Sequence, residues 1–104
     1  SCSARIIVSA SEMLSFFTDP IKHKGPVCAI TYDVVYKNGF MTGLVDSAGK
    51  PIGKLFIQTA EKGSGWVDYM WPKPGETVPS LKITYIKKAQ YQNQTYLVGS
   101  GVYI

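Results

Sequence analysis

Two periodicities follow one another along the first third of the chain, one helical and one extended. Between residues 4 and 18 apolar side chains recur every three or four positions, which predicts an N-terminal helix. Pro20 is expected to end that helix, because the residue before a proline is disfavoured in the helical region. From 27 to 36 apolar and polar residues alternate, so we expect a strand. One face of this strand would carry Cys28, Ile30, Tyr32, Val34 and Tyr36.

The second half of the chain is predicted to hold one more helix, followed by three strands. Apolar residues at helical spacing cover 52–62, and Gly63 is typical of a helix stop. Beyond it, short β-type runs are separated by turn sequences, so strands are expected over 66–71, 81–88 and 95–104. Consecutive strands joined by short loops form an antiparallel meander. The predicted fold class is therefore α+β, with helices packed on an antiparallel sheet.

Length and composition indicate one globular domain over residues 1–104. The chain is 45% hydrophobic and 17% charged, and its net charge is +4. We do not expect a nucleic-acid partner, because the lysines are scattered and Arg, the best residue for gripping phosphate, occurs only as Arg5. No apolar run approaches the ~20 residues of a membrane span. The chain also shows no signal-peptide pattern, so we expect a mature form or an excised domain whose targeting segment is absent.

Few residues offer catalytic or metal chemistry. His23 is the only histidine, and it has no companion at a metal-binding spacing, so we expect a solvated loop residue and no bound metal or cofactor. No Ser or Cys stands in a nucleophile motif, and we expect no enzymatic activity. Gly-Ser-Gly at 63–65 lacks the rest of a phosphate loop, while Gly-Ser-Gly at 99–101 lies in a predicted strand, where glycine marks a bulge or the close approach of another group. Cys2 and Cys28 either pair in an oxidising compartment or remain thiols, and both readings stay open.

The stretch 65–85, GWVDYMWPKPGETVPSLKITY, concentrates aromatic residues beside a lysine. Strand alternation places Tyr69 and Trp71 on one face. In the next strand Lys82 and Tyr85 take opposite faces, and the strand register decides which of the two joins that face. This pattern is typical of core packing. It also fits a ligand wall, with two aromatic hydrogen-bond donors and an ammonium suited to a small carboxylate.

The order of several motifs resembles the single Cache domain, type 2 subclass, an extracytoplasmic sensor domain of bacterial chemoreceptors, sensor kinases and some free-standing secreted proteins. The motifs are DSAGKP at 46–51, GSGWVDYMWPKPGE at 63–76, LKITYIKK at 81–88 and YLVGSGVY at 96–103. The resemblance covers nearly the whole chain and is most specific from Asp46 onward. It implies a PAS-like fold, in which a long N-terminal helix packs behind a curved antiparallel sheet.

The resemblance also implies a function. Members of this family bind a small organic anion, such as acetate, propionate or pyruvate, between the sheet and its covering loops. On family grounds, the matched positions expected to contact the ligand are Tyr69, Trp71, Lys82 and Tyr85. The family further implies a periplasmic or secreted location, a role in signal transduction or chemotaxis, and a signalling domain or receptor partner outside this chain. Asp46 matches a position that is either structural or ligand-contacting, and both roles stay open.

The chain departs from the family pattern after the first predicted strand. There DVVYKNGFMTGLVD, at 33–46, passes almost directly to the DSAGKP motif, so that a strand and a loop of the usual pattern are missing. The N-terminal helix is also short, with about four turns. A shortened sheet leaves an edge strand unpaired, which invites homodimerisation. The alternative function is therefore a degenerate Cache domain that serves as a structural or dimerisation module without a ligand.

Overall fold

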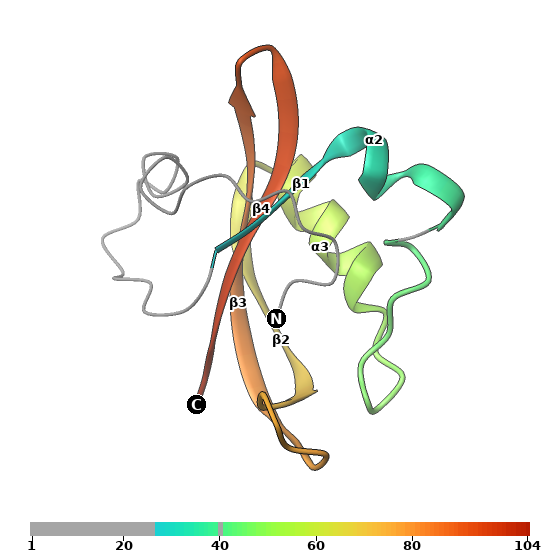
Figure 1. Ribbon diagram of the computed structural model, residues 1–104, viewed down its shortest axis with the longest axis vertical. Coiled ribbons are helices and arrows are strands. Elements are labelled where there is room, and N and C mark those ends of the chain that lie inside the picture. The colour runs from blue at the N-terminus through green and yellow to red at the C-terminus, as the bar shows by residue number, and fades with distance from the viewer. Residues whose placement is uncertain (1–26, 40) are drawn as a thin grey trace.

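The computed structural model describes residues 27–39 and 41–104, which form a four-stranded antiparallel sheet with helices on one side (Figure 1). No helix within these residues is long and apolar enough to cross a membrane. The helix expected over 4–18, its packing behind the sheet, His23 and Cys2 all lie outside the described residues. The elements, in chain order, are β1 (Val27–Thr31), α2 (Tyr32–Val35), the 3₁₀ helix η1 (Lys37–Gly39), α3 (Ile52–Glu61), β2 (Ser64–Pro72), β3 (Pro79–Tyr91) and β4 (Gln94–Tyr103).

The strands are arranged in the order β1-β4-β3-β2, and every neighbouring pair is antiparallel. The last three strands form the meander that the sequence predicts, and β1 adds to the outer side of β4. A two-residue turn joins β3 to β4, and its residues Gln92 and Asn93 both have positive φ, as tight hairpins of this type require. β1 and β2 are thus the edge strands of an α+β fold with an antiparallel sheet.

The strand predicted over 27–36 is wrong in its second half. β1 ends at Thr31, and the chain continues as the helical turn α2, in which Tyr36 N–H donates to Tyr32 O at 3.2 Å. Val35 is fully buried and Tyr36 is 53% exposed, the reverse of what the alternation implies. Over so short a run, an apolar pair followed by an aromatic residue is compatible with both a strand and a helical turn. The burial of Val35 in the core favours the helical turn.

The main core lies between α3 and one face of the sheet. α3 covers the expected 52–62 almost fully and turns Ile52, Phe56 and Ala60 inward. Gly53 allows the preceding loop to cross the helix at van der Waals distance, because any Cβ at this position would overlap the carbonyl oxygen of Met41. The buried hydrophobic cluster consists of Ile30, Val35, Met41, Ile52, Phe56, Ala60, Val67, Tyr69, Ile86 and Leu97.

The opposite face of the sheet carries a second set of buried side chains. Antiparallel pairing places alternate residues of β1, β3 and β4 on this face, away from α3. Its buried members are Ala29, Tyr85, Ala89, Tyr96, Val98 and Ser100. Both faces of the sheet are therefore apolar, and only the strand register tells which aromatic residue belongs to which face.

Candidate functional site

The register brings Tyr69, Trp71 and Lys82 together on the face that α3 covers. Tyr69 on β2 pairs directly with Lys82 on β3, and directly opposed residues of antiparallel strands project to the same side. The Tyr69 ring meets Trp71 edge-to-face at 6.2 Å. The Tyr69 ring also meets Phe56 of α3 edge-to-face at 5.5 Å. Tyr69, Trp71 and Lys82 therefore project from the same face of the sheet, and we refer to these three residues as the wall.

Tyr85 lies on the other face. It pairs with Trp66 of β2, and the two ring centroids are 5.1 Å apart with the rings tilted by 59°. Tyr85 is only 6% exposed, so it is packed against the second buried set. The register therefore answers the question that the sequence leaves open: Lys82, and not Tyr85, joins Tyr69 and Trp71. Ligand contact by any of these residues stays a prediction.

A buried hydroxyl pair lies next to the wall. The Tyr69 hydroxyl and Thr84 Oγ1 are 2.7 Å apart, and both residues are buried. Burial raises the pKa of the Tyr69 phenol, while the hydrogen bond to Thr84 opposes that rise. The phenol is therefore neutral at physiological pH, with one hydroxyl proton to donate. Thr84 was not among the residues expected to contact a ligand, although strand alternation places it on the same face as Lys82.

Lys82 is a half-buried cation for which the described residues provide no ion-pair partner. The two ion pairs found there are Lys50–Asp68 and Lys88–Glu61. Burial lowers the pKa of the Lys82 ammonium, with an opposing effect from the nearby Cys28 thiol. Its nitrogen lies 5.2 Å from the centroid of the Tyr103 ring, a cation–π distance. An ammonium that is partly removed from water gains most from an anion brought to it.

Tyr103 on β4 lies next to Lys82, on the side away from Tyr69. It pairs with Lys82 across β3 and β4, and its hydroxyl donates to Pro72 O at 2.7 Å, which anchors the ring. The ammonium of Lys73 lies 5.8 Å from the same ring. Sequence analysis missed Tyr103, because only the β3–β4 register places it beside Lys82.

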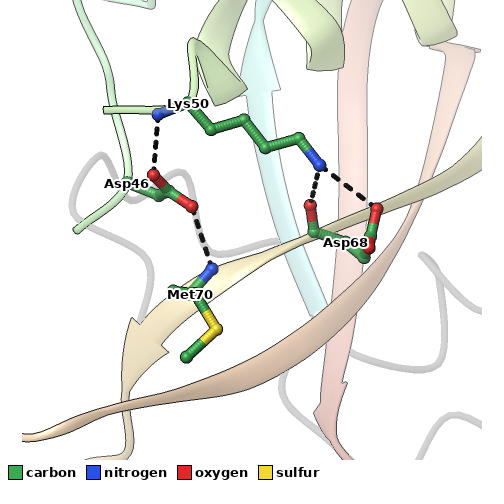
Figure 2. A network of polar contacts seen from close by, with 4 residues as sticks. All are labelled: Asp46, Lys50, Asp68 and Met70. Carbon is green, nitrogen blue, oxygen red and sulfur yellow. Dashed lines mark hydrogen bonds and ion pairs between the residues drawn. The ribbon is translucent and has the colours of Figure 1, made fainter. Parts of the chain in front are cut away.

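Asp46 clamps the loop before α3 to the outer edge of β2 (Figure 2). Its Oδ1 accepts the backbone N–H groups of Ala48 at 2.9 Å and Lys50 at 2.7 Å, and its Oδ2 accepts that of Met70 at 3.0 Å. These three bonds, with the one from Met70 the strongest influence, hold the pKa of Asp46 below its usual value. Both carboxylate oxygens thus accept backbone hydrogen bonds. Of the two roles left open for Asp46, structural or ligand-contacting, this geometry supports the structural one.

The Lys50 side chain fastens the same loop to β2 a second time. Its ammonium donates to the backbone oxygen of Asp68 and pairs with Asp68 Oδ1 at 3.2 Å (Figure 2). The backbone groups of Asp68 and Met70 that accept or donate here lie on the edge of β2 that faces away from β3. The loop therefore covers an edge strand and fixes the backbone on either side of Tyr69.

A second cation lies at the other end of the same face, but it is already neutralised. Lys88 is 3.6 Å from Glu61 Oε2 and 5.3 Å from the Tyr32 ring, and Tyr36 donates its hydroxyl to Glu61 Oε1 at 3.1 Å. Burial, reinforced by the Glu61 carboxylate, raises the pKa of Tyr32 to about 12. Within the described part of the chain, no three His, Cys, Asp or Glu residues cluster in a way that could hold a metal ion.

Comparison with known proteins places the chain in a family. A model of the Cache domain matches residues 22–104. Over 44 residues the chain is 39% identical to the methyl-accepting chemotaxis protein McpP of Pseudomonas putida, a match that covers 42% of this chain and 8% of that protein. The chain thus spans a small part of that curated relative.

Two solved structures are similar in both fold and sequence. One is the periplasmic sensor domain of a chemotaxis protein, with a TM-score of 0.59, 32% identity, and coverage of 93% of this chain and 76% of that chain. The other is the structure of a Cache chemosensory domain that recognises carboxylic acids. It has a TM-score of 0.51 and 32% identity over 62% of this chain and 43% of that one.

Proposed function

The chain belongs to the Cache domain family, and on this premise we propose that it is an extracytoplasmic sensor domain that binds a small monocarboxylate such as acetate, propionate or pyruvate. Binding of a carboxylic acid by a similar Cache chemosensory domain supports the ligand class. The periplasmic origin of another similar structure supports the location. The domain binds its ligand without transforming it, and passes the signal to a receptor or signalling domain outside this chain.

The observation that carries this proposal is the state of Lys82. Its ammonium is half-buried, no carboxylate of the described residues pairs with it, and it lies on the same sheet face as Tyr69 and Trp71. A carboxylate placed at Lys82 would form a charge-assisted hydrogen bond, which is about twice as strong as a neutral one. The aromatic wall would cover the ligand's short apolar part.

Each polar group of this face has a defined part in the proposed site. Lys82 supplies the charge, and the Tyr69 hydroxyl, held by Thr84, supplies one oriented donor or acceptor. Trp71 borders Tyr69, and its ring would extend the apolar surface offered to the ligand's tail. Asp46 contributes indirectly, because its bond to Met70 N–H holds the segment of β2 that carries both aromatic residues.

The test is a comparison of carboxylates with their neutral amides at constant ionic strength. Acetate, propionate and pyruvate are titrated into the domain alongside acetamide and propionamide, with calorimetry and thermal unfolding as the measurements. A ligand at a hundred times its dissociation constant stabilises the folded state by about 2.7 kcal/mol. We expect this stabilisation from at least one carboxylate and none from the amides.

The result also separates the proposal from the alternative of a degenerate domain without a ligand. If no carboxylate raises the melting temperature, the sensing function is refuted while the fold stands. Equal binding of an acid and its amide would show that the charge of Lys82 does not anchor the ligand.

A further inference from the structure

The side chain of Lys82 lies across the neighbouring strand β4 over a position that has no side chain of its own. Gly101 pairs with Thr84 on the α3 face of the sheet, two residues before Tyr103. A Cβ atom at Gly101 would lie 2.6 Å from Lys82 Cε and would overlap Thr84 Oγ1. Real Cβ atoms essentially never approach other atoms that closely, so the lysine stem occupies the volume that any other residue at 101 would fill.

Backbone conformation does not explain this glycine. The glycines with positive φ in the described residues are Gly39, Gly49, Gly63 and Gly75, and Gly101 is not one of them. Gly101 also stands inside a regular strand, where glycine weakens the sheet and contributes no packing. What remains is the space above it, which is filled by Lys82 and Thr84.

The other end of the lysine is held by an anchored ring. The Lys82 nitrogen lies 5.2 Å from the Tyr103 centroid, and the Tyr103 hydroxyl donates to Pro72 O. This bond ties the ring on β4 to the end of β2, across β3, so the ring is fixed from two strands. A long lysine side chain otherwise has free rotation about four bonds, and fixing it costs entropy whenever a ligand binds.

We propose that Gly101 and Tyr103 are positioning residues for anion recognition: Gly101 admits the Lys82 stem across β4, and the Tyr103 ring holds its ammonium in place before the ligand arrives. The inference rests on the proposed function. The affinity for a carboxylate then depends on two residues of β4, in addition to the lysine that would contact it. Pre-organisation of this kind raises affinity by lowering the ordering entropy lost on binding.

The experiment compares Gly101→Ala with the matched control Gly99→Ala. Gly99 lies on the same strand and the same face, but a Cβ there meets the flexible end of Ile86 at 3.0 Å and not the lysine. The first readout is the NMR shift of the Lys82 ε-methylene group in the ligand-free domain, assigned by its loss in Lys82→Met. The second is the dissociation constant for propionate, and the third is the melting temperature.

We expect Gly101→Ala to move the ε-methylene signal toward that of an exposed lysine and to weaken propionate binding about tenfold or more, the equivalent of one charge-assisted hydrogen bond. Gly99→Ala should keep both close to the wild type. Because a Cβ at 101 also presses on Thr84, the comparison is repeated as Thr84→Ala against Thr84→Ala/Gly101→Ala, where the same loss should reappear.

Tyr103 provides an independent arm in case Gly101→Ala does not fold. Tyr103→Leu should abolish the ring-current shift of the ε-methylene and weaken binding, and Tyr103→Phe, which keeps the ring, should retain most of both. An unchanged ε-methylene shift in Gly101→Ala, or in Tyr103→Leu, would overturn the proposal, as would equal effects of the two glycine substitutions. If the wild-type domain binds no carboxylate, the proposed function fails, and the ligand-free shift still decides whether Lys82 is positioned as inferred.

Discussion

Replacing Lys82 by Met should weaken ligand binding without weakening the fold. Methionine keeps an unbranched apolar stem that fits over Gly101, and it removes only the ammonium. In the described residues no carboxylate pairs with this ammonium, so its removal leaves no buried anion behind. The substitution relieves the desolvation of a half-buried cation, and it also removes the cation–π contact with Tyr103, which contributes about 0.5–1 kcal/mol. Because these two effects oppose each other, the free energy of unfolding should stay close to that of the wild type.

The loss in affinity follows from the interaction that the ammonium would make. A hydrogen bond to a charged group contributes about 1.5–3 kcal/mol, which corresponds to a roughly 10- to 150-fold higher dissociation constant. At a ligand concentration of a hundred times the wild-type dissociation constant, the wild type gains about 2.7 kcal/mol of stability, whereas Lys82→Met should gain only about 0.3–1.4 kcal/mol. The substitution should therefore weaken binding while leaving the stability of the ligand-free domain nearly unchanged, whereas ordinary destabilising substitutions lower that stability.

Urea unfolding with and without propionate measures both quantities on one sample. The control is Lys54→Met on the exposed side of α3, which makes the same change in net charge away from the site. The control should retain the full stabilisation by ligand. The reasoning is refuted if Lys82→Met is stabilised as much as the wild type, or if Lys54→Met loses as much as Lys82→Met.

Three further substitutions test the scaffold around the site. Tyr69→Phe should lower the free energy of unfolding by about 1–2 kcal/mol, because the buried Thr84 hydroxyl loses its partner, and urea unfolding without any loss would contradict this. Hydrogen bonds lower the pKa of Asp46, so its stabilising contribution is complete above about pH 4 and is lost as the pH falls through the lower folded-state value. The urea midpoint of the wild type should therefore drop more steeply in acid than that of Asp46→Asn, and parallel curves would count against the clamp. Gly53→Ala, a change that stabilises an ordinary helix by about 0.5–1 kcal/mol, should instead lower the melting temperature, because the new Cβ would overlap the Met41 carbonyl oxygen; a higher melting temperature would show that this loop does not cross α3 as described.

Local sequence patterns were sufficient for much of the fold. Helical spacing of apolar residues located α3, and β-type runs between turn sequences located the meander of β2, β3 and β4. The same reasoning failed at 32–36, where the five residues fit both periods and the burial of Val35 selected the helical turn. Short segments of this kind are decided by the packing partner, since their intrinsic preferences differ by only a fraction of a kcal/mol.

The candidate site was also only partly predictable from the sequence. Alternation by itself placed Tyr69 with Trp71 and separated Lys82 from Tyr85, because side chains along any strand point to alternate faces. It could not tell which of the latter two faces the first pair, nor bring Tyr103 and Gly101 to the lysine, because a shift of one residue in register exchanges the two faces of a sheet. Register depends on how β2, β3 and β4 pack together beneath α3. The local sequence thus determined which functional groups the chain carries and how they alternate along each strand. Only the tertiary structure, through the register of the strands, decided which of these groups lie together in one site.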